Sequence, residues 1–186
     1  HAGIDSSHIQ AGTMDDGEWG RYTEATDYFA KTFHGAIFDR SGISVEQLRA
    51  KAIQMKTRGG LGIILVDYLG LMTGPGRETK DALTHISRSL KSLAREFDVP
   101  VVAAHQMNRE IEKRGEETTP QLSDLRDSGS IEQDADVVMF LHCPPGKMEF
   151  DPRPVKLYMP KNRAGKVGSI DLQFIAKYTR FAGVQR

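Results

Sequence analysis

The feature that most constrains the fold is an apolar segment that ends in a carboxylate. Residues 61–67 read LGIILVD, so a nearly unbroken run of aliphatic side chains stops at Asp67. A strand with one face in water alternates apolar and polar residues, whereas a strand buried on both faces carries a continuous apolar run. The segment therefore predicts a central strand of a parallel sheet, with Asp67 at its carboxyl end.

The residues after this strand predict a crossover helix and a second buried strand. From Leu83 to Phe97, apolar side chains recur at the spacing of one helix face. The opposite face is basic and carries Arg88, Lys91 and Arg95. Residues 99–104, with the sequence VPVVAA, form a second apolar run of strand length. Because parallel strands need a long crossover connection, this order predicts an α/β fold with a mainly parallel sheet flanked by helices.

The N-terminal part of the chain predicts two more helices and one short strand. Residues 15–29 begin with two aspartates and then carry aromatic and apolar residues at helical spacing. Residues 44–47, SVEQ, have the spacing of a capping box and open a second helix that ends near residue 59. Residues 36–38 are a short strand candidate. Residues 1–12 carry no cap or periodicity that predicts an element, so we expect the chain to begin within a domain.

The C-terminal half predicts a long loop followed by strands. Residues 108–130 are charged and lack an apolar period, which is typical of a loop, and residues 135–141 then resume the sheet. Residues 155–159 and 169–174 alternate in polarity on either side of residues 161–165. This pattern predicts an antiparallel, hairpin-like edge.

Composition limits the class of protein. A chain of 186 residues suits a single domain, here residues 1–186, and its 25 basic and 25 acidic residues give no overall attraction to nucleic acid. The single cysteine, Cys143, cannot form an internal disulfide, and no signal peptide is recognisable. The longest apolar runs are shorter than the ~20 residues of a membrane helix. We therefore expect a soluble protein of a reducing, cytoplasmic compartment.

Two polar residues follow the two predicted parallel strands. In open α/β sheets, ligands bind outside the carboxyl ends of the strands, so Asp67 is a candidate Mg²⁺ ligand. An ordinary strand-end aspartate that caps a loop is an equally good explanation. Gln106 follows the second strand and is a candidate sensor of a nucleotide γ-phosphate. A glutamine that only bonds the local backbone is the alternative.

Two further segments carry groups that could contact phosphate. Residues 122–136 combine small, turn-forming residues with Arg126, and exposed backbone amides beside an arginine can hold a nucleic-acid backbone. A solvated loop that caps a helix is the alternative. Lys161 and Arg163 place two cations on a tight turn, which suits an arginine finger directed at a neighbouring subunit's nucleotide. A plain basic hairpin tip is the alternative.

The order and wording of these segments resemble the DnaB-type replicative DNA helicases over nearly the whole chain. Residues 66–69, VDYL, look like the Walker B strand of that family, and residues 86–94, ISRSLKSLA, look like its following helix. Residues 106–109, QMNR, resemble the family's Gln-Leu-Asn-Arg. Residues 123–136, SDLRDSGSIEQDAD, are close to its most distinctive segment.

The resemblance implies a RecA-like P-loop ATPase core and assigns roles to single residues. It makes Asp67 the Walker B ligand of Mg²⁺ bound to ATP, and Gln106 the γ-phosphate sensor. It makes Lys161 and Arg163 the fingers that reach the adjacent subunit's ATP. It also implies a channel loop that touches single-stranded DNA, with the residues Arg126, Asp127 and Gly129.

The chain contains no G-x-x-x-x-G-K-[ST] phosphate loop, which in this family lies upstream. We therefore expect that the N-terminal part of the domain is missing and that this chain alone does not hydrolyse ATP. The resemblance implies a hexameric helicase that moves on single-stranded DNA at a bacterial or phage replication fork, with primase and a helicase loader as further partners. A RadA-like recombinase ATPase and a non-catalytic adaptor that binds DNA or helicase subunits are the alternatives.

Overall fold

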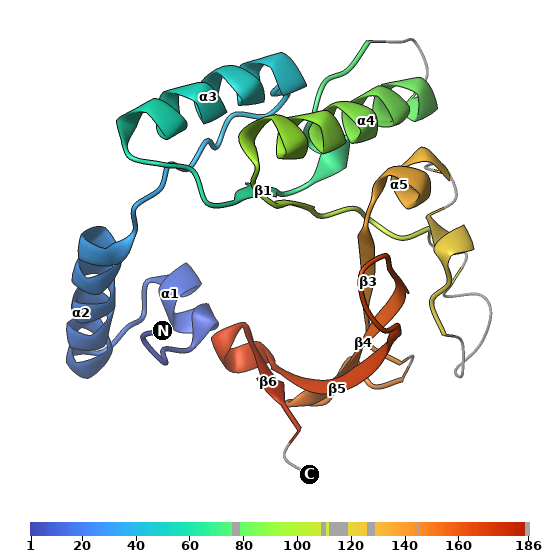
Figure 1. Cartoon of the computed structure of the whole chain (residues 1–186). Coiled ribbons are helices and arrows are strands. Elements are labelled where there is room, and N and C mark those ends of the chain that lie inside the picture. The colour runs from blue at the N-terminus through green and yellow to red at the C-terminus, as the bar shows by residue number, and fades with distance from the viewer. Residues whose placement is uncertain (76–78, 109–110, 112–118, 126–128, 145, 185–186) are drawn as a thin grey trace.

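The computed structural model describes residues 1–75, 79–108, 111, 119–125, 129–144 and 146–184. The helices are α1 (Ser6–Ala11), α2 (Asp16–Thr32), α3 (Val45–Arg58), α4 (Thr79–Phe97) and α5 (Gly129–Asp134). The strands are β1 (Ile64–Val66), β2 (Val101–Ala103), β3 (Val137–His142), β4 (Arg153–Asn162), β5 (Gly168–Ile175) and β6 (Arg180–Gly183). Figure 1 shows α3 and α4 together on one side of the molecule, and the strands β3 to β6 curving along another.

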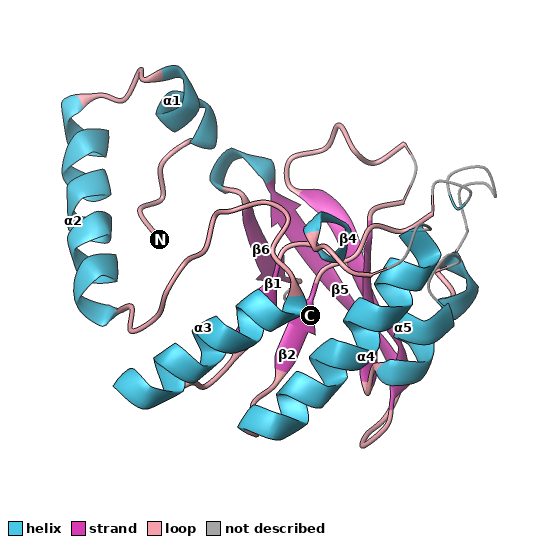
Figure 2. Ribbon diagram, turned by 90° about the horizontal axis from the view of Figure 1, so that it is seen from above, coloured by secondary structure: helices cyan, strands magenta, loops and turns pink. Residues whose placement is uncertain are grey.

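The predicted strand–helix–strand unit is confirmed. β1 and β2 pair in parallel, with Ile64 opposite Val101 and Val66 opposite Ala103. Viewed from above, α3 and α4 run beside each other next to this strand pair (Figure 2). The apolar face of α4 is buried as its spacing predicts, and Ile86 is only 1% exposed. The main core contains Val45, Ala52, Ile64, Leu69, Met72, Leu83, Ile86, Leu90, Leu93, Phe97 and Val99.

The C-terminal strands form a separate antiparallel sheet in the order β3-β4-β5-β6. The predicted hairpin is confirmed, since β4 and β5 pair from Arg153 opposite Phe174 to Met159 opposite Gly168. The expectation that residues 135–141 resume the parallel sheet is wrong, because β3 pairs with β4 and with no other described strand. A cavity of about 660 Å³ is lined by residues of both β2 and β3, which belong to different sheets.

Both predicted N-terminal helices form. The side chain of Asp15 accepts a hydrogen bond from the Glu18 amide at 2.7 Å and opens α2. Helix α1 is not predicted from the sequence, although Asp5 caps it by accepting from the Ser7 amide at 2.9 Å. A single cap without apolar periodicity is a weak signal for so short a helix.

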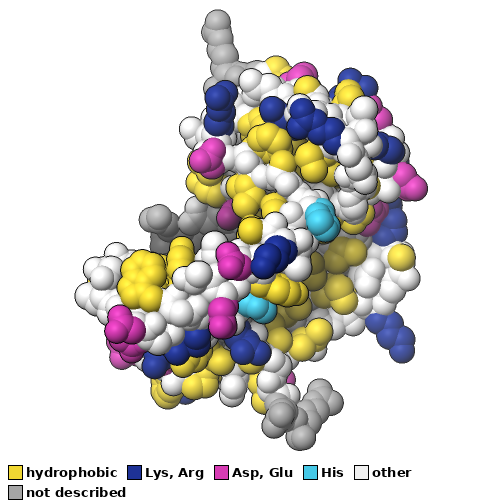
Figure 3. All heavy atoms as spheres, turned by 90° about the vertical axis from the view of Figure 1, so that its left-hand side faces the viewer, with side chains coloured by type: hydrophobic (Ala, Val, Ile, Leu, Met, Phe, Trp, Pro, Cys, Tyr) yellow, Lys and Arg dark blue, Asp and Glu magenta, His cyan; other side chains and the backbone are white. Residues whose placement is uncertain are grey.

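Two features of the N-terminal part differ from the sequence predictions. Residues 36–38 form no strand, and Ile37 is 74% exposed, because no described strand lies beside them to pair with. The apolar stripe of α2 is also open, with Tyr28 56% exposed. Figure 3 shows hydrophobic side chains on this face of the molecule, some of them within a hollow.

Candidate functional site

Asp67 and Gln106 lie at the same edge of the parallel strand pair. Asp67 directly follows β1, Gln106 lies three residues beyond β2, and both side chains are exposed. Two backbone hydrogen bonds of Ala104 join the segments that follow β1 and β2. Its N–H donates to the Val66 carbonyl at 2.9 Å, and its carbonyl accepts from the Leu69 amide at 3.0 Å. The Asp67 carboxylate and the Gln106 amide therefore lie on two segments that are hydrogen-bonded to each other.

Asp67 is suited to a metal ion that brings most of its own ligands. Among the residues described, no group of three His, Cys, Asp or Glu side chains is placed to hold a metal. Mg²⁺ usually keeps several waters and takes one or two carboxylates together with phosphate oxygens. A single exposed carboxylate therefore fits a magnesium–nucleotide complex and does not fit a metal site built only from protein groups.

The residues after Gln106 contact the segment that leads to residues 126–128. The Asn108 amide donates to the Asp124 carbonyl at 3.2 Å. Met107 packs against a second hydrophobic cluster, which is centred on Leu125, Val138 and Phe140. The predicted sensor segment and the stem of the predicted DNA loop are thus in direct contact.

Of the three predicted DNA-contacting residues, only Gly129 is described. Arg126 and Asp127 lie outside the described residues. Gly129 is the first residue of α5, and a side chain at this position would have no atom within 4 Å. No described residue therefore crowds the position that a Gly129 side chain would take.

Lys161 and Arg163 are held by α5 and by the residues that follow it. The Lys161 Nζ donates to the Glu132 carbonyl at 2.5 Å. The Arg163 amide donates to the Asp136 carbonyl at 2.9 Å, and its Nη1 lies 3.1 Å from Asp136 Oδ1. The Arg163 side chain is nevertheless 62% exposed. The backbone of the hairpin tip is thus hydrogen-bonded to its neighbours, while the guanidinium of Arg163 reaches solvent.

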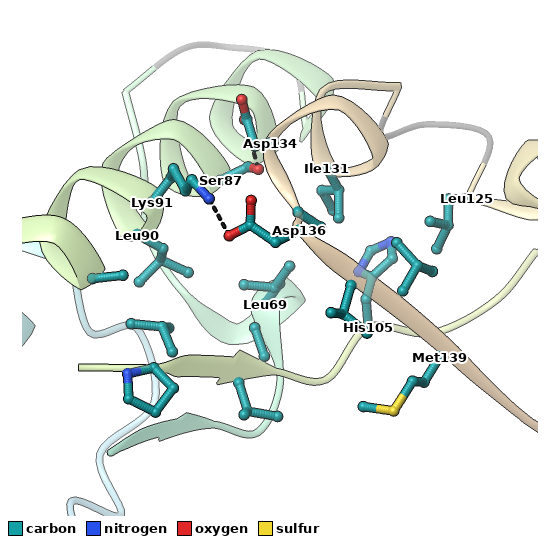
Figure 4. Close-up of a pocket in the computed structure, with 18 of the residues that line it drawn as sticks. Leu69, Ser87, Leu90, Lys91, His105, Leu125, Ile131, Asp134, Asp136 and Met139 are labelled. Carbon is teal, nitrogen blue, oxygen red and sulfur yellow. Dashed lines mark hydrogen bonds and ion pairs between the residues drawn. The ribbon is translucent and has the colours of Figure 1, made fainter. Parts of the chain in front are cut away.

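Asp136 is a residue whose individual role the sequence does not predict. Its carboxylate forms ion pairs with Lys91 of α4 and with Arg163. The hydrogen bond from Lys91 is the main cause that holds the pKa of Asp136 below its usual range, and the Arg163 charge acts in the same direction. Figure 4 shows Lys91 and Asp136 pointing toward each other beside the contact of Ser87 with Asp134. The basic face of α4 was visible in the sequence, but its partner 45 residues away was not.

The predicted site residues therefore fall into two groups. Asp67 and Gln106 share the edge of the β1–β2 pair, whereas Lys161 and Arg163 are bound to α5 and Asp136. Within the described part of the chain, no hydrogen bond or ion pair joins Asp67 to Gln106, Lys161 or Arg163. These hydrogen bonds and ion pairs therefore do not bring Asp67 and Gln106 together with Lys161 and Arg163 at one nucleotide.

Comparison with known proteins gives the family. The DnaB-like helicase C terminal domain family matches residues 1–183. The chain is 38% identical to "Replicative DNA helicase DnaC" of Bacillus subtilis over 98% of its own length and 41% of that protein. It is 37% identical to "Replicative DNA helicase DnaB" of Geobacillus stearothermophilus, again over 98% of this chain and 41% of the relative. The chain therefore spans about two fifths of the length of these curated relatives.

Solved structures agree with this match. One of them, described as an ATPase domain, superposes with a TM-score of 0.89 at 33% identity, covering 99% of this chain and 67% of that one. A DnaB-like replicative helicase, whose structure was described together with its interactions with primase, superposes with a TM-score of 0.88 at 33% identity and is covered over 45% of its length. The described helices include none long and apolar enough to cross a membrane. The resemblance and the RecA-like fold are confirmed, and the chain belongs to the DnaB-like helicase C-terminal domain family.

Proposed function

We propose that this chain acts within a ring-shaped, ATP-dependent replicative DNA helicase that moves along single-stranded DNA and unwinds duplex DNA at the replication fork. The observation that carries the proposal is the family match over residues 1–183, with relatives named as replicative DNA helicases over nearly the whole chain. The RadA-like recombinase and the adaptor are less well supported, because the relatives quoted are helicases by name.

Asp67 and Gln106 form the half of the nucleotide site that we assign to the chain's own subunit. When bound with ATP, Mg²⁺ would supply positive charge against the phosphates. Asp67, exposed at the exit of β1, would hold this metal directly or through water. Gln106 would contact the γ-phosphate. Its connection through Met107 and Asn108 to the stem of the DNA loop supports a role in coupling ATP to DNA.

Lys161 and Arg163 form the half that we assign to the neighbouring subunit's nucleotide. An arginine finger needs a fixed backbone and a guanidinium that is free to meet the phosphates. Arg163 has both properties, since its amide is bonded to Asp136 while its side chain is 62% exposed. The lack of any described contact with Asp67 supports action between subunits, and so a closed homo-hexamer is part of the proposal.

The DNA contacts and the other partners are also proposals. Arg126, Asp127 and Gly129 would line the central channel. The lack of any described atom within 4 Å of a side-chain position at Gly129 is compatible with this role. A primase contact is proposed because the structure of a similar helicase was described with its interactions with primase. A contact with a helicase loader and a site of action in the cytoplasm, at a bacterial or phage replication fork, complete the proposal.

The proposal is tested with the full-length protein expressed from its own gene. We expect ATP hydrolysis that single-stranded DNA stimulates, together with unwinding of a forked duplex. Asp67→Asn should lower turnover on the order of 100-fold, because a neutral amide cannot offset the charge of a bound metal. Asp27→Asn on the exposed surface of α2 is the matched control and should keep full turnover.

Two outcomes would contradict the proposal. Equal turnover in the Asp67→Asn and Asp27→Asn proteins would remove Asp67 from the nucleotide site. Electron microscopy should show closed rings, and open filaments would instead favour the recombinase alternative.

A further inference from the structure

The carboxylate of Asp136 joins parts of three elements. It follows α5 and directly precedes β3, it pairs with Lys91 of α4, and it pairs with Arg163 at the tip of the β4–β5 hairpin. Its side chain is 51% exposed, so the carboxylate is not placed there by burial in the core. Its ion pairs are with two cations, one on α4 and one on the hairpin.

The contacts between Asp136 and Arg163 involve both backbone and side chain. The hydrogen bond from the Arg163 amide to the Asp136 carbonyl sets where the arginine Cα lies. The Nη1–Oδ1 contact of 3.1 Å then restricts the direction of the long side chain. No other hydrogen bond of the Arg163 side chain is present among the residues described, and a guanidinium has further N–H groups to offer. Asp136 therefore orients the guanidinium without using up its donors.

We infer that Asp136 is a positioning residue for the arginine finger: it holds the Arg163 guanidinium ready for the neighbouring subunit's triphosphate. This inference rests on the proposed function of Arg163. Lys91 has a supporting part, because it fixes the same carboxylate from the side of α4. Without that third charge, a carboxylate and a guanidinium at the surface would hold each other only weakly.

The surroundings of Asp136 support a fixed position for it. Ser87 of α4 donates to the Asp134 carboxylate at 2.8 Å, and Ser130 bonds Thr84 at 3.1 Å, so α5 is bound to α4 along its length. Lys161 adds a bond from the hairpin to a carbonyl of α5. The hairpin tip is thus attached through α5 to the longest helix of the main core. Small errors in the position of a catalytic group cost large factors in rate, which is why such attachment matters.

The first experiment compares variants of the full-length protein in the presence of single-stranded DNA. Asp136→Asn keeps the size of the side chain but removes the charge that holds Arg163. We expect turnover at saturating ATP to fall roughly 10- to 100-fold, while the KM for ATP and the melting temperature stay within error of the parent protein. Asp171→Asn breaks the 3.3 Å ion pair with Lys156 on the same hairpin and is the matched control, expected to keep full turnover.

The second experiment tests whether Asp136 acts across the subunit boundary. Rings are assembled from a mixture of Asp136→Asn and Asp67→Asn subunits. An Asp136→Asn subunit keeps its own metal ligand, and an adjacent Asp67→Asn subunit keeps a well-placed finger, so their shared site is complete. We expect the mixture to hydrolyse ATP severalfold faster than either variant alone. A residue that only stabilises its own subunit gives no such complementation.

The outcomes separate this inference from the proposed function. Normal turnover in Asp136→Asn, or a loss that mixing does not restore, would overturn the positioning role of Asp136. Normal turnover in Arg163→Ala would instead overturn the finger role itself. A loss of turnover in Arg163→Ala together with restored activity in the mixed rings would support both.

Discussion

Truncation of Leu93 in α4 should measure how far the main core holds the parallel strand pair in place. Leu93 is 2% exposed and belongs to the cluster that includes Ile64 of β1. Leu→Ala in a packed core costs the lost transfer free energy plus a term for the cavity, together about 2–5 kcal/mol. Because Leu93 is almost fully buried in this cluster, we expect a cost of about 3 kcal/mol.

Leu65→Ala in β1 is the matched control, because it removes the same atoms from an open position. Leu65 is 69% exposed, so less than a third of its side chain can contribute by burial. Full burial of a leucine side chain contributes about 2 kcal/mol, which leaves roughly 0.6 kcal/mol at this site. The two variants therefore share their chemistry and differ about fivefold in expected cost.

The measurement is thermal and urea unfolding of the 186-residue chain, followed by circular dichroism. For chains of this size, 1 kcal/mol shifts the melting temperature by about 2–4 °C, so Leu93→Ala should lower it by about 6–12 °C and Leu65→Ala by about 1–2 °C. Equal shifts in the two variants would refute the reasoning, since they would mean that Leu93 is no better packed than Leu65.

Three shorter predictions concern a helix cap, a partly buried histidine and catalysis. Ser44→Ala removes the cap that accepts from the Gln47 amide at 3.3 Å and should cost about 1 kcal/mol in urea unfolding, whereas Ser41→Ala should cost almost nothing. Burial lowers the pKa of His142, so the unfolded chain binds protons more readily than the folded one. The free energy of unfolding should therefore fall as pH drops from about 7.5 to about 5.5. His142→Asn should flatten that dependence, and an unchanged slope would show that His142 is not its source. The 186-residue chain by itself should not hydrolyse ATP, because it contains no phosphate loop, and Asp67-dependent release of phosphate by this polypeptide would contradict that expectation.

The parts of the fold that the sequence predicts correctly are those that local chemistry determines. Three sequence patterns each predict the burial or backbone bonding of their own segment. They are the apolar period of α4, the capping box before α3 and the continuous apolar run that contains β1. The hairpin of β4 and β5 is predicted for the same reason, since alternation shows within one segment. Such signals need no knowledge of distant residues.

The parts that sequence reasoning misses depend on partners far away in the sequence. Residues 36–38 have a strand-like composition, yet a strand forms only where another strand can pair with it. The position of β3 in the antiparallel sheet likewise depends on which strand lies beside it, and its own apolar run does not specify that. The sequence of α5, GSIEQD, indicates a loop because small and polar residues outnumber apolar ones, and the helix forms where α4 packs against it.

The candidate site shows the same division. Asp67 and Gln106 can be proposed from sequence because each follows an apolar run, and a parallel sheet brings such positions to one edge. Asp136 cannot, because its role comes from Lys91 and Arg163, which lie 45 residues before it and 27 residues after it. Ion pairs between residues so far apart in the chain produce no periodic pattern in the sequence.

The stability of the β1–β2 strand pair determines when the carboxylate of Asp67 is held in place. Each strand is only three residues long, and a sheet of two short strands is not stable by itself in water. Its resistance to local opening must come from the side chains of α3 and α4 that pack on it. In hydrogen exchange, the amide of Ala104 should therefore be protected only as long as these helices stay docked. Undocking of α4 would release Asp67 even while the helix itself stays folded.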